Sequence, residues 1–484
     1  MKLAEYASYD ASGLADLVAR KAVSPRELAH AARDAIGLVN PHVNAVVETY
    51  AERLDDPERA GLGTGPFRGV PFLIKDVFGH EAGRQIEWGS RLCRGMVADK
   101  DTHVAELFRA AGLNILGRSA TPEYSMSSAT ETALYGNTSN PWRAGFSAGG
   151  STGGGMAAVI SGMVPIAHGS DIAGSIRNPA SWCGGVGLKP SRGRVSFGPQ
   201  LDENGFGLAT TFVQTRSVRD AAAMLDCLAL PQPGDPFKIP RPAASYASLI
   251  QQKQARCMIG FSLTPLMGAE VDGEVADAVR ATARLLADLG HEVEETSLDF
   301  DGLAAAHHLM DVWFFGFHLR AEGFARMTGR EVGPRTLEPV VHAIYEHART
   351  IGPEQFLAAV SGVNAARRQL ARLFETYDVW LTPTVARVAE PFGRYSLQRT
   401  DVTFESLARK LYAVPFQFTV PHNIMGTPAI SLPLAMHSSG LPIGIQLGTR
   451  PADEHVVLGL AATLEEARPW RDRVPPLHVA NLAK

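Results

Sequence analysis

The stretch FSAGGSTGGGMAAV (residues 146–159) places five glycines around Ser151 and Thr152 and continues directly into an apolar segment. This pattern is not typical of a flexible linker, because Gly/Ser linkers do not normally run into an apolar, helix-competent sequence. A phosphate-binding loop of the Walker type is excluded, since no lysine follows the glycines at the required position. The composition instead indicates close packing of backbone against backbone or against a ligand.

A nucleophilic serine is the next interpretation of this stretch. GGSTG (residues 149–153) matches G-x-S-x-G, the nucleophile elbow of α/β-hydrolases, which would make Ser151 the nucleophile of an esterase. An elbow follows a hydrophobic strand, however, and the preceding NPWRAGFSA (residues 140–148) contains a proline, a charge and a glycine. The esterase therefore stays an alternative that the local sequence does not favour.

Two further stretches supply a lysine and a second serine. GVPFLIKD (residues 69–76) is a short apolar run, which predicts a buried strand with Lys75 at its end. Ser175 lies downstream of Ser151 in HGSDIAGSIRNPAS (residues 168–181), a second segment rich in small residues. A hydroxyl needs a base to become a nucleophile, and a buried lysine can be that base once burial lowers its pKa by about three units.

The composition narrows the class of protein. The 484 residues carry a net charge of −4 with 20% charged side chains, which gives no electrostatic reason to expect nucleic acid or a membrane surface as partner. The four cysteines are widely spaced without a zinc pattern, and no window is apolar enough to span a membrane. We expect a cytoplasmic protein that acts on a small neutral molecule and uses no metal or cofactor.

The pattern of strands and helices predicts an α/β fold with a mixed sheet. SPREL (residues 24–28) is a helix start within a region, 11–55, that looks helical, and strands are expected at 69–76 and from residue 113. The proline-rich 231–245 is the best linker, and helices dominate 302–376. Strands return in DVWLTPT, PAISLPLA and GLPIGIQLG near the C-terminus. The helical insert is expected to form one wall of a cleft.

Together these stretches resemble the amidase signature family of serine hydrolases. The resemblance rests on GVPFLIKD, on NPWRAGFSAGGSTGGGMAAV, on GSDIAGSIRNPASWCGGVGLKPSRGRVS and on the C-terminal FTVPHNIMGTPAISLPLAMHSSGLPIGIQLG, and it is weakest over 231–400. It implies a large mixed β-sheet flanked by helices on both faces. It also implies a single domain over 1–484, with a catalytic core at 60–230 and a helical variable part at 302–400 that lines the substrate cleft.

The resemblance also assigns roles. Ser175 is the expected nucleophile, Ser151 the bridging serine after a cis peptide bond at Gly150–Ser151, and Lys75 the general base. The expected oxyanion hole consists of Ile172, Ala173, Gly174 and Ser175. Supporting roles are expected for Thr152, Asp171 and Arg177, and the substrate pocket is expected to include Trp313, Phe314, Phe317 and Asn423.

Two positions depart from the family pattern. Ala173 stands where a glycine is commoner, so the oxyanion hole would be strained if that residue needs a positive φ. Thr152 replaces a serine but keeps the hydroxyl, so its role is expected to survive.

The function implied is hydrolysis of C–N bonds in small neutral amides through an acyl-enzyme on Ser175. Within the family the resemblance is to branches that cleave nylon oligomers, aryl amides and urethanes. A subunit of a transamidation complex is disfavoured, because FGPQLDENGFG follows GRVS in place of the usual basic and aromatic stretch. A non-catalytic subunit stays an alternative, and a homodimer is an alternative to a monomer.

Overall fold

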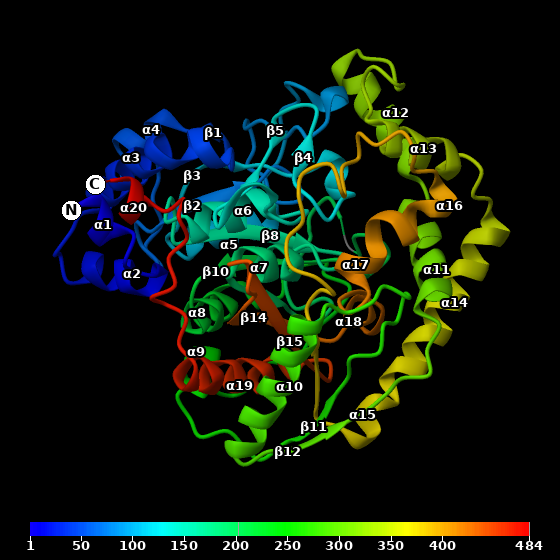
Figure 1. Cartoon of the computed structure of the whole chain (residues 1–484). Coiled ribbons are helices and arrows are strands. Elements are labelled where there is room, and N and C mark those ends of the chain that lie inside the picture. The colour runs from blue at the N-terminus through cyan, green and yellow to red at the C-terminus, as the bar shows by residue number, and fades with distance from the viewer. Residues whose placement is uncertain (202, 484) are drawn as a thin grey trace.

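The computed structural model describes residues 1–201 and 203–483 and is built around one mixed sheet (Figure 1). Its eleven strands follow the order β1-β3-β2-β8-β10-β9-β14-β15-β13-β11-β12. The strands are β1 (Val46–Thr49), β2 (Pro71–Lys75), β3 (Asn114–Ser119), β8 (Ile166–Asp171), β9 (Val186–Lys189), β10 (Thr210–Thr215), β11 (Met258–Phe261), β12 (Glu292–Glu295), β13 (Val379–Pro383), β14 (Ala429–Met436) and β15 (Pro442–Thr449).

Both parallel and antiparallel pairs occur in this sheet, which confirms the mixed α/β prediction. β2 runs parallel to β3 and β8, and β11 runs parallel to β12 and β13, whereas the remaining neighbours are antiparallel. Two small hairpins lie outside it. They pair β4 (Glu131–Thr132) with β5 (Gly136–Asn137), and β6 (Ser139–Asn140) with β7 (Arg143–Ser147).

Helices flank the sheet. Those of eight residues or more are α2 (Ala11–Ala19), α3 (Pro25–Val43), α5 (His103–Ala110), α6 (Gly153–Ile160), α8 (Val218–Leu228), α10 (Gly273–Asp288), α11 (Gly302–Phe314), α12 (Phe317–Thr328), α13 (Pro339–Ala348), α14 (Pro353–Ala371) and α19 (Glu454–Ala467). The shorter ones are α1 (Leu3–Tyr6), α4 (Ala51–Asp55), α7 (Arg177–Cys183), α9 (Tyr246–Leu249), α15 (Leu373–Thr376), α16 (Phe404–Leu407), α17 (Ala413–Phe416), α18 (Val420–Met425) and α20 (Val479–Leu482). Short 3₁₀ helices occur at η1 (Arg91–Cys93) and η2 (Glu123–Ser125), and η3 (Ala408–Tyr412) is a π-helix.

The N-terminal region shows both a correct and a wrong expectation. Ser24 caps α3, its side chain accepting from the Glu27 N–H while Glu27 accepts from the Ser24 N–H, so the predicted helix start is confirmed. The helical prediction for 11–55 is wrong over 46–49, where the chain forms the edge strand β1 against β3. Tertiary pairing overrides local propensity there.

The fold brings the segment around Ser151 and the segment around Ser175 together beside strands β2 and β8. β2 and β8 are neighbours, so the ends of both strands lie side by side. α6 follows Ser151 and packs against β8, β10 and β2, whereas α7 follows Ser175 and packs against β9, β14 and β15. Two helices thus begin beside the same strand ends.

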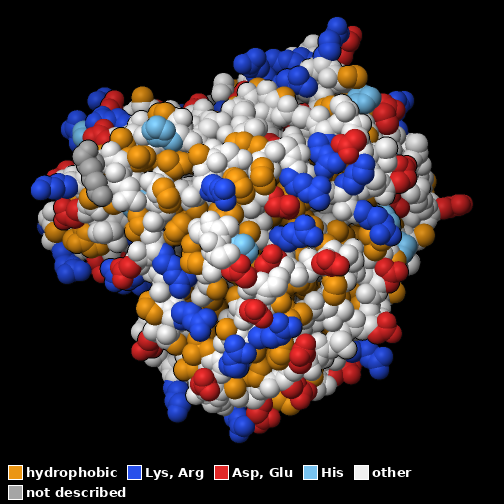
Figure 2. Space-filling view, viewed as in Figure 1, with side chains coloured by type: hydrophobic (Ala, Val, Ile, Leu, Met, Phe, Trp, Pro, Cys, Tyr) orange, Lys and Arg blue, Asp and Glu red, His pale blue; other side chains and the backbone are white. Residues whose placement is uncertain are grey.

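One hydrophobic core contains the buried side chains of most strands, and a second one joins the helices α11–α14, which form one side of the molecule in Figure 1, to α7 and β13. Trp182 of α7 and Trp380 of β13 are fully buried in it. On the face drawn in Figure 2, acidic and basic side chains are interspersed with apolar ones, as the small net charge suggests. None of the helices within residues 1–201 and 203–483 is long and apolar enough to cross a bilayer.

Candidate active site

Lys75, the last residue of β2, is the centre of the site. Its side chain is fully buried, and its Nζ lies 2.7 Å from Ser151 Oγ, 3.0 Å from Ser170 Oγ and 3.1 Å from Thr152 Oγ1. Burial lowers the pKa of Lys75 well below its usual 10.5, although the Asp171 carboxylate acts in the opposite direction. An amine in this setting favours the neutral form, which can accept a proton.

Ser151 lies in the turn between β7 and α6. The peptide bond before it is cis, as the resemblance implied. Its carbonyl oxygen accepts a hydrogen bond of 3.1 Å from Thr121 Oγ1, so the backbone of the turn is held while the hydroxyl faces Lys75.

Ser175 lies between β8 and α7 and lines the same cavity as Ser151. Its carbonyl oxygen accepts from the Thr152 N–H at 3.2 Å, which ties the two serine turns together. Ser175 is buried, and within the described residues its hydroxyl makes no hydrogen bond to protein. A serine with a free hydroxyl beside a second serine that contacts a buried lysine can act as a nucleophile.

The backbone before Ser175 adopts a geometry that the sequence only partly predicts. Gly174 has φ +136°, whereas Ala173 is not among the residues with positive φ, so the alanine carries no backbone strain. A Cβ on Gly174 would lie 2.4 Å from Thr419 Oγ1, so no side chain fits there.

The expected oxyanion hole needs one correction. The Gly174 N–H donates to Asp171 Oδ1 at 2.8 Å and is therefore not free for a substrate oxygen. Among the described residues, no acceptor takes a hydrogen bond from the N–H groups of Ile172, Ala173 or Ser175. These three donors are the ones that could face an oxyanion.

Asp171 and Arg177 form a buried ion pair directly behind the Ser175 turn. Arg177 donates to both carboxylate oxygens, from Nη2 at 2.9 Å and from Nε at 3.0 Å. Burial alone would raise the pKa of Asp171, but the Arg177 guanidinium outweighs it and lowers that pKa to about 2. The charged pair fixes the strand end from which the Ser175 turn begins.

Asn423 belongs to this network rather than to the pocket in which it was expected. Its Nδ2 donates to Asp171 Oδ1 at 3.0 Å, and its Oδ1 accepts from Arg177 Nη2 at 2.7 Å. It is almost completely buried and is not part of the cavity wall. Its role in the structure is to hold the ion pair.

The cavity beside the serines is narrow, with a volume of about 30 Å³. Trp313 and Phe317 line it as expected, but Phe314 is fully buried in the core beyond the wall, 6.1 Å from the Phe404 ring. Sequence reasoning missed eight further wall residues, which are Phe78, Tyr124, Ser125, Met126, Ser170, Ala209, Phe315 and Arg320.

Two residues of β8 that support Lys75 were also missed. His168 Nδ1 accepts from the Lys75 N–H at 3.3 Å, and its Nε2 lies 2.8 Å from Thr211 Oγ1. Burial lowers the pKa of His168 to about 3, so the ring is neutral and can accept that bond. Ser170, two residues on, contacts Lys75 Nζ. The alternation of His168 and Ser170 along one strand was the signal that could have found them.

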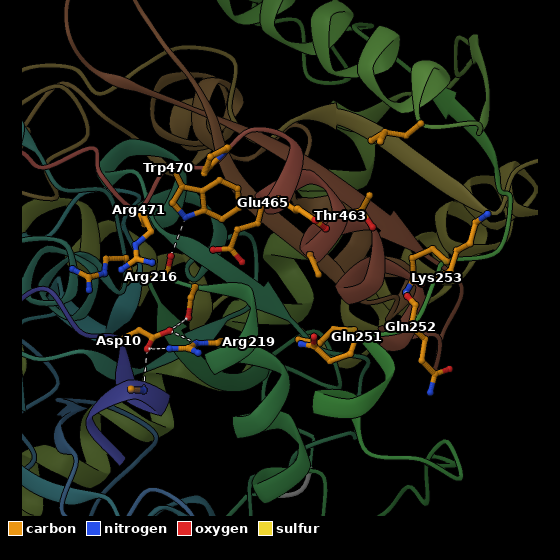
Figure 3. Close-up of a pocket in the computed structure, with 18 of the residues that line it drawn as sticks. Asp10, Arg216, Arg219, Gln251, Gln252, Lys253, Thr463, Glu465, Trp470 and Arg471 are labelled. Carbon is orange, nitrogen blue, oxygen red and sulfur yellow. Dashed lines mark hydrogen bonds and ion pairs between the residues drawn. The ribbon is translucent and has the colours of Figure 1, made fainter. Parts of the chain in front are cut away.

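A larger hollow, of about 1300 Å³, lies elsewhere, between the N-terminal helices, the segment 250–256 and the end of α19. Figure 3 shows Asp10 and Arg219 paired next to each other among the residues that line it, which also include Trp470 and Glu465. None of the predicted catalytic residues lines this hollow. Among the described residues no group of three or more His, Cys, Asp or Glu side chains is arranged to hold a metal ion.

The arrangement of a buried lysine, a serine after a cis bond and a second serine agrees with the comparisons. Residues 27–458 match the family model described as Amidase. The chain belongs to the amidase family. It is a hydrolase of amide C–N bonds, and the family's mechanism uses a Ser-cisSer-Lys triad.

The relatives of this amidase match almost its whole length. It is 36% identical to the 6-aminohexanoate-cyclic-dimer hydrolase of Paenarthrobacter ureafaciens, over 97% of this chain and 96% of that protein. It is 32% identical to the acylamidase of Rhodococcus erythropolis, over 96% of each. The structure of a 6-aminohexanoate cyclic dimer hydrolase in complex with substrate superposes with a TM-score of 0.91 at 34% identity, over 97% of this chain and 99% of that one. These findings confirm the predicted family and fold.

Proposed function

We propose that this amidase cleaves its substrate through an acyl-enzyme on Ser175, with Ser151 as proton bridge and Lys75 as general base. The 2.7 Å contact between Lys75 Nζ and Ser151 Oγ is the observation that carries the proposal. The neutral amine takes the Ser151 proton while Ser151 takes that of Ser175, and Ser175 Oγ attacks the carbonyl carbon.

The remaining steps use the same groups. The N–H groups of Ile172, Ala173 and Ser175 stabilise the oxyanion, and each such donor contributes about 2.7–4 kcal/mol to catalysis. The proton returns through Ser151 to the leaving nitrogen, and the C–N bond breaks. Water then attacks the carbonyl carbon of the Ser175 ester and gives a proton to the same serine–lysine relay. The bond between that carbon and Ser175 Oγ breaks, the acid leaves, and the relay returns the proton to Ser175 Oγ. Thr152, Asp171 and Arg177 position the two turns.

The proposed substrates are small neutral amides, either aryl or aliphatic, and the range extends to nylon oligomers and to carbamates. The names of the relatives, a cyclic-dimer hydrolase and an acylamidase, support this range. We further propose that the chain forms one domain, with a core over 60–230 and a cleft wall from 302–400, and that it acts in the cytoplasm as a homodimer. A panel of amides, anilides, carbamates and esters tests the range, and sedimentation velocity tests the dimer.

Substitution of the two serines tests the mechanism. Ser175→Ala is expected to lower kcat for a nitroanilide by at least about 10³-fold, and Ser151→Ala by a comparable factor. When catalytic residues act as one unit, removal of any one of them costs nearly as much activity as removal of all of them. Ser438→Ala, in an exposed loop, is the control. A fluorophosphonate probe followed by peptide mapping should label Ser175. Label on Ser151 would instead support the esterase alternative.

A further inference from the structure

An arginine without an acidic partner lines the active-site cavity. Arg320 lies on α12, three residues after Phe317 and four before Phe324, so the three side chains share one face of the helix. The rings of Phe317 and Phe324 lie 5.0 and 6.2 Å from that of Tyr124, a wall residue. This face of α12 is therefore the one that closes the cavity.

The guanidinium group is held in place but is not neutralised. Its Cζ lies 5.7 Å from the centroid of the Trp88 ring, within cation–π range. Within residues 1–201 and 203–483, no carboxylate pairs with the Arg320 guanidinium, and no acceptor takes a hydrogen bond from that group; the backbone N–H of Arg320 donates to the Gly316 carbonyl within the helix. Arg320 is exposed to solvent as a whole residue. The protein packed around it lowers its pKa, and Tyr124 acts in the opposite direction. An anion beside it would stabilise its charge.

Arg320 is the only positively charged residue among the described residues that line the cavity. The other charged wall residue is Asp171, whose carboxylate is fully engaged by Arg177. The remaining wall residues are aromatic, aliphatic or hydroxyl-bearing. The cavity therefore has one charged group that protein does not satisfy, and that group has the planar pair of donors that matches a carboxylate.

We propose that Arg320 binds a carboxylate of the substrate, so that amides carrying a carboxylate away from the scissile bond are cleaved in preference to neutral amides of the same shape. The proposal rests on the proposed function and extends it beyond neutral amides. Arg320 acts on specificity and not on the chemical step.

Two matched substrate pairs test this proposal and identify which side of the amide carries the carboxylate. On the acyl side, N-(4-nitrophenyl)glutaramate is compared with 4-nitrobutyranilide. On the amine side, 4-(butyrylamino)benzoate is compared with butyranilide. The readout is the ratio of kcat/KM for the anionic compound to kcat/KM for the neutral one, because general damage lowers both members of a pair and leaves the ratio unchanged.

Arg320→Gln is expected to lower this ratio about 10- to 100-fold for at least one pair, as a charge-assisted hydrogen bond requires. Arg320→Lys should give an intermediate ratio, since it keeps the charge but loses the fork. Arg326→Gln, an exposed position on the same helix, is the matched control and should keep the wild-type ratio. A ratio within twofold of wild type for both pairs in Arg320→Gln would overturn the proposal.

A binding measurement separates this proposal from the proposed function. In a Ser175→Ala background, calorimetry gives Kd for the glutaramate and for the benzoate with and without Arg320→Gln. A 10- to 100-fold weakening of one of them supports the role of Arg320. Equal affinities, or no binding of either compound, would overturn it. If wild-type enzyme hydrolyses no compound of the panel while Arg320 still governs binding, the failure belongs to the proposed function alone.

Discussion

In the proposed mechanism, the reaction depends on whether the amine of Lys75 is protonated. Its pKa lies well below 10.5 because of burial, and only the neutral amine can take the Ser151 proton. Activity should therefore fall as pH drops through this lowered pKa and level off above it. The pH profile of kcat/KM for a neutral anilide should show its acidic limb well below 10.5, and a limb close to 10.5 would contradict the role of Lys75.

Asp171 should be sensitive to loss of its charge. Asp171→Asn leaves the Arg177 guanidinium buried without a counter-ion, which is expected to lower the free energy of unfolding by about 3–5 kcal/mol. Urea titration measures the loss. Asp277→Asn is the matched control, because its ion pair with Arg280 is exposed and should contribute less than about 1 kcal/mol.

The same ion pair predicts a pH dependence with a defined sign. The pKa of Asp171 is lowered from 3.8 to about 2 in the folded protein, so the stabilisation is complete above 3.8 and is lost as pH falls through about 2. The stability difference between wild type and Asp171→Asn should narrow across that window. A difference that stays constant there would show that the charge of Asp171 is not what stabilises the fold.

For individual residues, the sequence predicts which of them lie in the active site but not all of the contacts that they make there. Lys75, Ser151, Thr152 and Ser175 are identifiable because their motifs are long and occur in order. Asn423 was misplaced because its stretch reveals proximity to the site without showing which way the side chain points. The position of Arg320 depends on the packing of α12 against Tyr124, and no local pattern encodes that.

Among the elements, α6 depends on a glycine that no other residue can replace. A Cβ on Gly154 would lie 2.5 Å from the backbone nitrogen and oxygen of Ala120, in a buried contact between helix and chain. Gly154→Ala should therefore lower the free energy of unfolding by about 3 kcal/mol or more, the upper end of the usual cost of overpacking, because backbone atoms must move. Thermal and urea unfolding measure this effect.

Gly37 on α3 is the matched control for Gly154. It is exposed, and a Cβ there would meet nothing within 4 Å. Gly37→Ala should stabilise the protein by about 0.4–1 kcal/mol, since alanine favours the helix and restricts the unfolded chain. Similar effects at the two positions would show that propensity, and not the close approach at α6, decides the outcome.

Predictability of the elements follows the strength of their local signals. α3 and α10 begin at side-chain caps, Ser24 and Asp272, and β2 ends at Lys75 as the apolar run predicted. The helix break within the aromatic run at 311–319 was not predicted. It occurs where Gly316 adopts φ +74° and separates α11 from α12. That break turns Phe315 and Phe317 into the cavity wall while Phe314 enters the core.

At the scale of the whole molecule, the sheet joins two parts of the chain that the sequence shows only in succession. Strands up to β10 form one half and β11–β15 the other, and they meet where β9 pairs with β14. Strand order could not be predicted from periodicity, because pairing between distant segments leaves no local pattern. The proline-rich stretch 231–245 links the halves in sequence, yet the sheet is continuous across them.

A buried ion pair spans the same junction and provides the last prediction. Arg194, after β9, donates from Nη2 to Glu454 Oε2 at 2.8 Å and from Nε to Oε1 at 3.0 Å, and Glu454 begins α19 on the other half.

Because one sheet runs through both halves, wild type should unfold in a single transition, with far-UV circular dichroism and tryptophan fluorescence changing together in urea. Glu454→Gln should move that transition to lower urea by the equivalent of about 3 kcal/mol without splitting it. Glu292→Gln, in an exposed pair with Arg256, should leave the midpoint nearly unchanged. Two separated transitions in wild type, or a shift of only one probe in Glu454→Gln, would show that the halves are independent units and would refute the single domain over 1–484.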